Sequence, residues 1–295
     1  MTPATTVTGF SLAFLAAITW AIAPVFYKRA IDHVSYYSLG AIRCIGYIVS
    51  AGAFLLVTMG SGSFSFPGIK LFVLVFVCSN VWLVLGDFLY FASLHRLGVS
   101  LCVPITSAYP LLAVPASWIF LKTPFNYMVF AAAILIVLGV ILLSHRTGSP
   151  EHLAPSVSGI FLAFLTMCCW TFGIITNKFL LEAIPAPQLE WWRAVSVTTG
   201  SWVLFMVMDN IKDLKRLSLR NITEMSLAGA LGLAVGNLLF TYSFKFISVD
   251  IATCIASSRP FIASLFAFFI LKERLTRIKV AGISLVTIGI ILISL

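Results

Sequence analysis

Two charged side chains stand out in this sequence because each falls inside a long apolar stretch. Arg259 is followed by Pro260, and Asp87 comes seven residues after Asn80. A charged group costs roughly 3 kcal/mol or more at the centre of a bilayer, so such a residue usually faces a cavity or a partner. Arg259 and Asp87 are therefore the first candidates for binding an ionic group.

Arg259 has two interpretations. It binds an anionic group of a ligand, a carboxylate or a phosphate, with Tyr109 facing it from a related Tyr109-Pro110 pair. Alternatively, it pairs with an internal carboxylate and ties two helices together. Pro260 and Pro110 favour the first interpretation, because a proline frees a backbone carbonyl and bends a membrane helix where the backbone lines a cavity.

Asp87 is expected to be the one clear carboxylate within the membrane, and it has three interpretations. A buried carboxylate holds a proton more tightly and could carry one for coupling. It could instead be the counter-charge to Arg259, or lie close enough to a membrane surface to be solvated. Asn80 is expected on the same helix face, since seven residues make nearly two turns.

The composition indicates which elements must position these residues. The chain has 295 residues, of which 60% are apolar and 10% charged, and its mean hydropathy is +1.06. Such a chain is neither a soluble globular protein nor a disordered one, because a single core cannot hide that much apolar surface. Its formal net charge of +9 is spread over short polar segments, which indicates orientation signals and lipid contacts and not a nucleic-acid partner.

The six cysteines all lie in apolar stretches without zinc-like spacing, so we expect packing residues, no metal and no cofactor. Apolar runs separated by Pro, Gly and charges predict an all-α membrane protein with ten transmembrane helices. The predicted helices are residues 8–30, 35–58, 69–93, 98–121, 125–144, 157–181, 188–208, 222–245, 249–271 and 276–295.

The second half of the sequence aligns with the first at a constant offset of 150 residues. Residues 9–15 read GFSLAFL and residues 159–165 read GIFLAFL. The same offset matches the following pairs: Trp20 with Trp170, Lys28 with Lys178, Arg43 with Arg193, Asp87 with Asn237, Tyr109-Pro110 with Arg259-Pro260, and Gly139 with Gly289. The sequence therefore predicts two five-helix repeats, residues 1–148 and 149–295, in one integrated transmembrane domain.

An odd number of helices in each repeat makes the second repeat enter the membrane from the opposite face. The result is an inverted repeat, which is typical of secondary transporters whose sites lie near the midplane between the halves. Alternating access follows, because exchanging the conformations of the two repeats turns a cavity from one face to the other.

The matched aromatic pair Trp20 and Trp170 lies in mid-helix. Trp20 shares a helix face with Tyr27, and Trp170 shares one with Asn177, seven residues further along in each case. The two indoles either pack the core or line a cavity with these polar companions, since binding sites combine aromatic walls with a few polar groups.

Asn80 and Asn237 are further candidates for binding substrate. Lys28 and Lys178 lie near helix ends, where they either extend to the membrane surface or bind substrate.

Arg43 and Arg193 come early in their helices, and each follows an acidic residue, Asp32 or Glu182, by eleven positions. This repeated acid–arginine spacing predicts a structural tie or gate at each membrane surface. Trp191 and Trp192 precede Arg193 and are expected at the membrane interface.

These features resemble the drug/metabolite transporter superfamily, and its EamA-like branch most of all. Each repeat begins Gly-x-x-Leu-Ala and continues with Trp, Lys and an early Arg in its second helix. The segment 271–276, LKERLT, resembles the branch's acidic residue before the last helix; the first repeat departs from it with Thr123 opposite Glu273. The resemblance implies export or exchange of amino acids, organic acids or nucleotide-linked compounds.

The prediction is a secondary active transporter for a small anionic or zwitterionic metabolite, acting as a monomer or homodimer in the bilayer of a prokaryotic cytoplasmic membrane. A flippase for a lipid headgroup or a lipid-linked phosphate compound is the alternative, and no assembled catalytic group suggests an enzyme. The odd-numbered connections between helices lie on one side of the membrane and carry twelve Lys and Arg residues, whereas the opposite side carries four. Because basic loops stay on the cytoplasmic side, this count places both termini outside the cytoplasm. The resemblance implies the opposite orientation.

Overall fold

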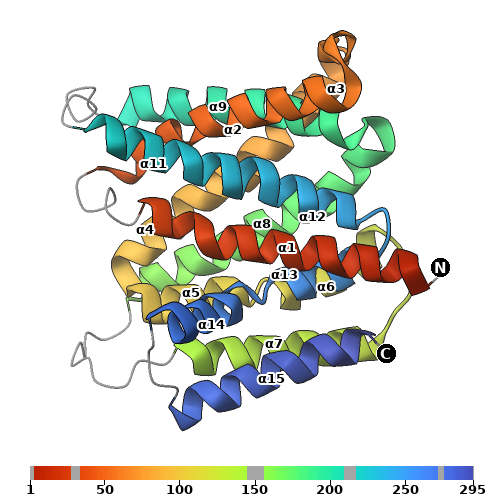
Figure 1. The fold of residues 1–295 in the computed structure, drawn as a ribbon, viewed down its shortest axis with the longest axis vertical. Coiled ribbons are helices and arrows are strands. Elements are labelled where there is room, and N and C mark those ends of the chain that lie inside the picture. Colours follow the sequence, from red (N-terminus) through yellow and green to blue (C-terminus); the bar gives the residue numbers. More distant parts are fainter. Residues whose placement is uncertain (1–2, 28–33, 145–155, 209–216, 272–275, 295) are drawn as a thin grey trace.

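The computed structural model describes residues 3–27, 34–144, 156–208, 217–271 and 276–294. Within these ranges the chain is helical apart from short connections. Seven segments of the described chain are long and apolar enough to cross a membrane. Figure 1 shows the helices running roughly side by side, with both termini at one end of the bundle. We call this end A and the opposite end B.

The first repeat crosses the bundle five times, beginning at end A. Its third crossing is continuous through a π-helical segment, and its fourth is broken in the middle. The elements are α1 (Pro3–Tyr27), α2 (Tyr36–Met59), the short η1 (Ser61–Phe64), α3 (Ile69–Ser79), η2 (Asn80–Leu85), α4 (Gly86–Leu97), α5 (Val99–Ser107), α6 (Pro110–Phe120) and α7 (Tyr127–Ser144).

The second repeat begins at end B and has the same sequence of crossings in the opposite sense. Its elements are α8 (Val157–Ala183), α9 (Ala186–Met208), α11 (Leu219–Gly229), η3 (Ala230–Gly236), α12 (Asn237–Ser243), α13 (Val249–Ala256), α14 (Arg259–Leu271) and α15 (Arg277–Ser294). The prediction of ten membrane helices in two inverted repeats is therefore confirmed, although several ends differ; for example, the third crossing reaches Leu97 and not residue 93.

The irregular segments repeat as faithfully as the helices do. The π-helical segments η2 and η3 occupy equivalent positions, and so do the breaks before Pro110 and at Ser257–Ser258. A proline lacks the N–H that would continue the helix, which explains a break beside each of Pro110 and Pro260. π-Helical turns are rare and frequently occur at functional sites. Both kinds of irregularity fall near the middle of the bundle.

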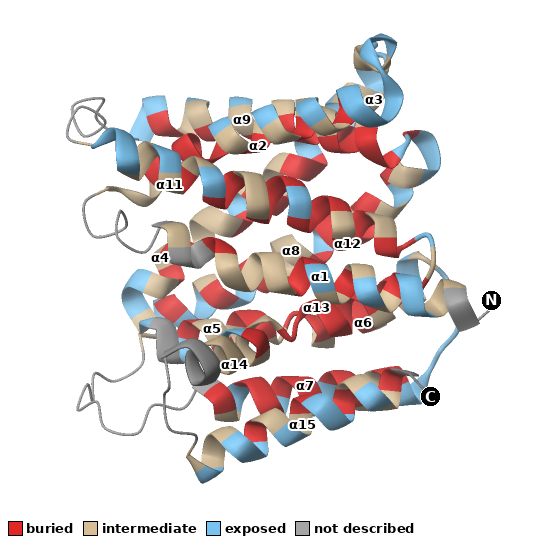
Figure 2. Ribbon diagram, viewed as in Figure 1, coloured by how far each residue is buried: buried red, intermediate tan, exposed pale blue. Residues whose placement is uncertain are grey.

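Burial follows from the environment of each face. In Figure 2 the buried residues gather where helices meet, while exposed residues are frequent on the outer helices. Many of these exposed residues are large and apolar, such as Val57, Phe120, Phe161 and Val207. Such a surface suits lipid, because hydrocarbon tails need no polar side chains.

Candidate functional site

The guanidinium of Arg259 lies among three aromatic rings near the middle of the bundle. Its Cζ is 5.4 Å from the ring centroid of Trp20, 5.8 Å from that of Tyr109 and 5.2 Å from that of Trp170. These distances suit cation–π attraction. The structure thus brings together four residues that the sequence singled out; we call Trp20, Tyr109 and Trp170 the aromatic cage.

Arg259 has no counter-ion among the residues that the structure describes. The ion pairs found there join Arg43 to Asp87, Arg193 to Glu190 and Arg220 to Glu224. The described part of the chain therefore does not support the interpretation that Arg259 pairs with an internal carboxylate. An aromatic ring accepts no conventional N–H···O bond, so the donors of Arg259 stay available for an anionic ligand.

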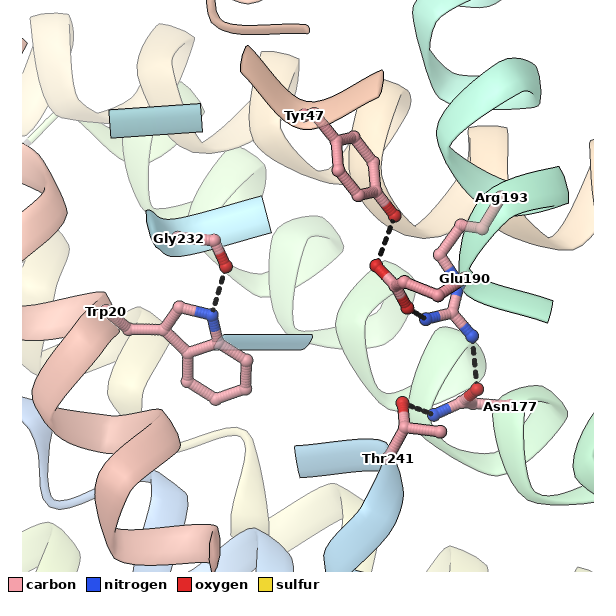
Figure 3. Close-up of polar contacts among 7 residues, drawn as sticks. All are labelled: Trp20, Tyr47, Asn177, Glu190, Arg193, Gly232 and Thr241. Atoms are coloured by element: carbon pink, nitrogen blue, oxygen red, sulfur yellow. Dashed lines mark hydrogen bonds and ion pairs between the residues drawn. The ribbon is translucent and has the colours of Figure 1, made fainter. Parts of the chain in front are cut away.

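The three rings of the cage are fixed by contacts with the other helices. Trp20 donates its indole N–H to the backbone carbonyl of Gly232 at 2.9 Å (Figure 3). Trp170 donates its indole N–H to Oδ1 of Asp87 at 3.2 Å. Tyr109 donates its hydroxyl to the carbonyl of Thr253 at 3.4 Å. Each wall of the cage is therefore oriented by a specific acceptor.

Glycines allow both indoles to approach the opposite repeat. A Cβ added to Gly236 would lie 2.5 Å from Nε1 of Trp20, and one added to Gly86 would lie 3.0 Å from Cδ1 of Trp170. Gly86 and Gly236 are equivalent positions, each at the end of a π-helical segment. Each repeat thus uses a glycine to accept the tryptophan of the other.

Asp87 pairs with Arg43, so of its three interpretations the one that makes it the counter-charge to Arg259 is wrong. Nη2 of Arg43 donates to Oδ2 of Asp87, and their side chains keep 11% and 16% of their surface accessible. Both residues line a small pocket of about 20 Å³, little more than the space of one water molecule, together with Tyr36, Tyr37 and Phe88. These residues come from the end-B halves of their helices, so the pair lies between the cage and end B. The predicted partner Asp32 lies outside the described residues.

A second polar cluster lies towards end A and is more deeply buried. Nη1 of Arg193 binds Oε2 of Glu190 at 2.6 Å, and Nη2 of Arg193 donates to Oδ1 of Asn177. Tyr47 donates to Glu190 at 2.7 Å, and Asn177 donates to Thr241 at 3.0 Å. We call these five residues the end-A network; Figure 3 shows that it joins α2 of the first repeat to three elements of the second.

The end-A network was predicted only in part. The predicted pairing of Arg193 with Glu182 is wrong, because Arg193 binds Glu190 and Glu182 is exposed. Sequence reasoning placed the segment around Glu190 at the membrane surface, yet Glu190 is 1% exposed. The offset of 150 residues aligns Glu190 with Gly40, so the first repeat has no acidic residue at this position. This difference between the two repeats was the sequence signal that could have pointed to Glu190.

Two further expectations concern carboxylates and amides. Asp87 is not the one carboxylate inside the bundle, because Glu190 and Asp250 are both more buried. Asn80 donates to the carbonyls of Phe76 and Ser196 and thereby fastens α3 to α9. The common face expected for Asn80 and Asp87 stays a prediction, and both side chains lie beside α9: Asn80 against Gly200, and Asp87 in a pocket with Ser201.

Asn237, the repeat equivalent of Asp87, is 2% exposed, and its Nδ2 has no hydrogen-bond partner among the described residues. Buried donors are rarely left without an acceptor, so this amide is a candidate for a ligand contact. Nζ of Lys178 lies 3.5 Å from the carbonyl of Phe244, near end A. Its repeat equivalent, Lys28, lies outside the described residues.

Comparison with known proteins now identifies the family. Residues 7–145 and 157–295 each match the model of the EamA-like transporter family. The chain belongs to this family. The resemblance found in the sequence is therefore confirmed. The protein is a membrane transporter and not an enzyme, and its substrate is a small molecule.

Relatives of the EamA-family chain support the same conclusion. It is 28% identical over 294 residues to an uncharacterized transporter of Archaeoglobus fulgidus, covering 96% of this chain and 97% of the relative. It is 24% identical over 134 residues to the uncharacterized inner membrane transporter YhbE of Escherichia coli, covering 45% and 42%. A solved crystal structure shares its fold with a TM-score of 0.82 and 15% identity, over 99% of this chain and 98% of that chain. The EamA-family chain is thus an integral membrane protein.

Proposed function

We propose that this transporter moves a small anionic or zwitterionic metabolite, of the amino acid or organic acid class, across the membrane as an exporter or exchanger. Arg259 binds the anionic group within the aromatic cage. The observation that carries the proposal is a mid-bundle guanidinium surrounded by Trp20, Tyr109 and Trp170, with no carboxylate partner in the described chain. A guanidinium binds a carboxylate through two parallel hydrogen bonds, which gives both affinity and orientation.

The neighbourhood of Arg259 suits a ligand of mixed polarity. The aromatic cage offers apolar surface, and Asn237, which follows the Gly236 that packs on Trp20, has an amide donor without a partner among the described residues. A site of this kind binds the carboxylate of a metabolite at one point and its carbon skeleton against the rings. All these residues come from one chain, so a monomer suffices for binding, and a homodimer would contain two such sites.

Alternating access supplies the transport step. The end-A network is almost fully buried, whereas the Arg43–Asp87 pair lines a small pocket nearer end B. In this conformation the cage is more firmly separated from end A than from end B. We propose that Arg43 and Arg193 act in the two gates, that Lys178 and its sequence counterpart Lys28 contribute to them, and that the breaks beside Pro110 and Pro260 let the helix halves move.

The number of basic residues at each end of the bundle supports an orientation of the protein in the cytoplasmic membrane of a prokaryote. Basic residues of short connections are retained on the cytoplasmic side. Twelve of them belong to the end-B connections and flanks, against four at end A. End B is therefore the cytoplasmic end, both termini are outside, and the present conformation faces inward.

The test is a thermal-shift screen of the purified protein, followed by uptake into proteoliposomes. The panel contains the twenty amino acids, small mono- and dicarboxylates and inorganic phosphate. A compound that binds the folded state raises its melting temperature by mass action. We expect the shift and the uptake to be lost in Arg259→Ala, with partial retention in Arg259→Lys, which keeps the charge without the planar fork.

Arg220→Ala is the matched control, because Arg220 is an exposed arginine on α11 paired with Glu224. It should bind and transport like the wild-type protein. Equal uptake by Arg259→Ala and wild type would overturn the role of Arg259. Movement of a lipid-linked phosphate compound between leaflets, without uptake of any soluble panel member, would replace the proposal with flippase activity.

A further inference from the structure

The two indole walls of the cage are fastened to different parts of the molecule. Trp20 donates to the backbone carbonyl of Gly232, which belongs to the main chain of η3. Trp170, at the equivalent position in the other repeat, donates to the side chain of Asp87 on α4. A main-chain acceptor moves only with its helix, whereas a side-chain acceptor also depends on the contacts that fix its own rotamer. The position of Trp170 therefore depends on what holds Asp87.

Asp87 is held by the arginine that we place in the gate at end B. Its Oδ2 accepts from Nη2 of Arg43, while its Oδ1 accepts from the indole of Trp170. Hydrogen bonds to a carboxylate are about twice as strong as those between neutral groups. The two oxygens of one carboxylate thus connect Arg43 to Trp170, with a single side chain between the gate and the cage.

Packing along α4 supports the same connection. A Cβ added to Gly86 would lie 3.1 Å from Nε1 of Trp170, so the missing side chain lets the indole reach its acceptor at the next residue. Tyr90 lies about one turn further on, and its ring centroid is 5.6 Å from that of Trp170. The neighbouring Phe91 has its ring centroid 5.7 Å from Cζ of Arg43. This part of α4 therefore contacts the gate arginine and the cage indole together.

The described part of the second repeat lacks an equivalent connection. Asn237 replaces the bridging aspartate, and its Nδ2 has no hydrogen-bond partner among the described residues. At end A, Arg193 bonds to Glu190 and Asn177 of its own repeat. The indole of Trp20 bonds to neither of them, since its acceptor is a main-chain carbonyl. Within the described chain, hydrogen bonds therefore connect the cage to the gate at end B and not to the arginine at end A.

We propose that Asp87 is a positioning residue that makes the Trp170 wall of the binding site depend on the gate at end B. While Arg43 pairs with Asp87, the carboxylate is fixed and Trp170 stays against Arg259, with its ring centroid 5.2 Å from Cζ. When the pair separates, Trp170 loses a fixed acceptor and the cage loosens. The affinity for substrate therefore follows the state of this gate. This inference rests on the proposed function for its role in transport, although its test requires no substrate.

The test labels all seven tryptophans with 5-fluorotryptophan and follows their ¹⁹F resonances in the detergent-solubilised protein at one fixed pH. Trp170→Phe and Trp20→Phe assign the two cage signals by their disappearance. Arg43→Gln removes the charge at the gate, and we expect it to shift the Trp170 signal and to leave the Trp20 signal in place. Arg43→Lys keeps the charge and a donor without the planar fork, so its Trp170 signal should lie closer to the wild-type position.

Asp87→Asn separates an effect through this side chain from a general loosening of the bundle. It retains an acceptor oxygen for Trp170 but no charge for Arg43. In the Asp87→Asn background, Arg43→Gln should therefore cause no further shift of the Trp170 signal. Tyr47→Phe is the matched control, because it removes a contact at end A, the hydrogen bond to Glu190. It should leave the Trp170 signal at its wild-type position.

A Trp170 signal that does not move in Arg43→Gln overturns the proposal, and so does one that moves equally in the Asp87→Asn background. A shift of equal size in Tyr47→Phe, or in the Trp20 signal of Arg43→Gln, also overturns it, since the change would then be general to the bundle. The role of Arg259 is decided separately by uptake, so either proposal can fail while the other stands.

Discussion

Arg193 and Glu190 form an ion pair 2.6 Å long on one face of α9, and neither side chain keeps more than 2% of its surface accessible. Removing two charges from solvent costs several kcal/mol per ion, and that cost is offset by their mutual attraction and by further hydrogen bonds. Tyr47 and Asn177 supply two such bonds from α2 and α8, while Nε of Arg193 has no hydrogen-bond partner among the described residues. The pair is therefore stable only while the two repeats are closed against each other at end A.

Removing one partner of this pair should destabilise the protein strongly. Glu190→Ala leaves the buried guanidinium of Arg193 without its counter-charge, and breaking a buried pair in this way costs about 3–5 kcal/mol. We expect a large fall in the melting temperature of the detergent-solubilised protein. The measurement is thermal unfolding followed by intrinsic fluorescence.

Glu224→Ala is the matched control for Glu190→Ala. Its pair with Arg220 is also made within one helix, but the arginine is 70% exposed. Exposed pairs of this spacing contribute about 0.3–0.5 kcal/mol, so the melting temperature should change little. Equal effects of the two substitutions would contradict the structural importance of the end-A network.

Two glycines of α2 should respond in opposite ways to the same substitution. A Cβ on Gly46 would lie 1.7 Å from the backbone oxygen of Ser226, whereas a Cβ on Gly40 meets nothing within 4 Å. Gly46→Ala forces α2 and α11 apart, which costs about 1–3 kcal/mol or more. Gly40→Ala should stabilise the helix by about 0.4–1 kcal/mol, because alanine restricts the unfolded chain.

Melting temperatures of the two variants, measured side by side, test this prediction. Since both positions lie in one helix, any general effect of alanine on helix formation is the same for each. A Gly46→Ala protein as stable as Gly40→Ala would show that the close crossing of α2 and α11 is absent in the folded protein.

The ten helices and the central site could be predicted because their signals are local or repeated. Apolar runs of sufficient length define the helices. The offset of 150 residues makes Tyr109 equivalent to Arg259, and Trp20 equivalent to Trp170. An inverted repeat brings equivalent mid-helix positions together at the centre. For this reason the four residues that form the cage and its cation could be selected before the fold was described.

The ion pairs could not be predicted because they depend on packing between helices. The partner of Asp87 is Arg43, 44 positions away in the sequence on another helix, so no local pattern indicates the pair. Glu190 lies in the first turns of its helix, where sequence reasoning expects solvent. Its burial comes from Tyr47 on α2, a contact between residues 143 positions apart.

The cage makes a specific prediction about its indoles. Trp170→Ala removes a ring that positions the Arg259 guanidinium, a contact of about 1 kcal/mol, so the affinity for a compound identified in the panel should fall about fivefold. Trp118→Ala is the control, since Trp118 packs on Phe125 and Phe130, away from the cage. Isothermal titration of both variants measures the difference, and equal affinities would exclude a binding role for Trp170.

The proposed orientation predicts which end is accessible from outside the cell. Ser65 lies at end A and Ser218 at end B, and both are exposed. A membrane-impermeant maleimide should label Ser65→Cys in intact cells and Ser218→Cys only after permeabilisation. The native protein, whose six cysteines lie in the helices, gives the background. The reverse pattern would place both termini in the cytoplasm.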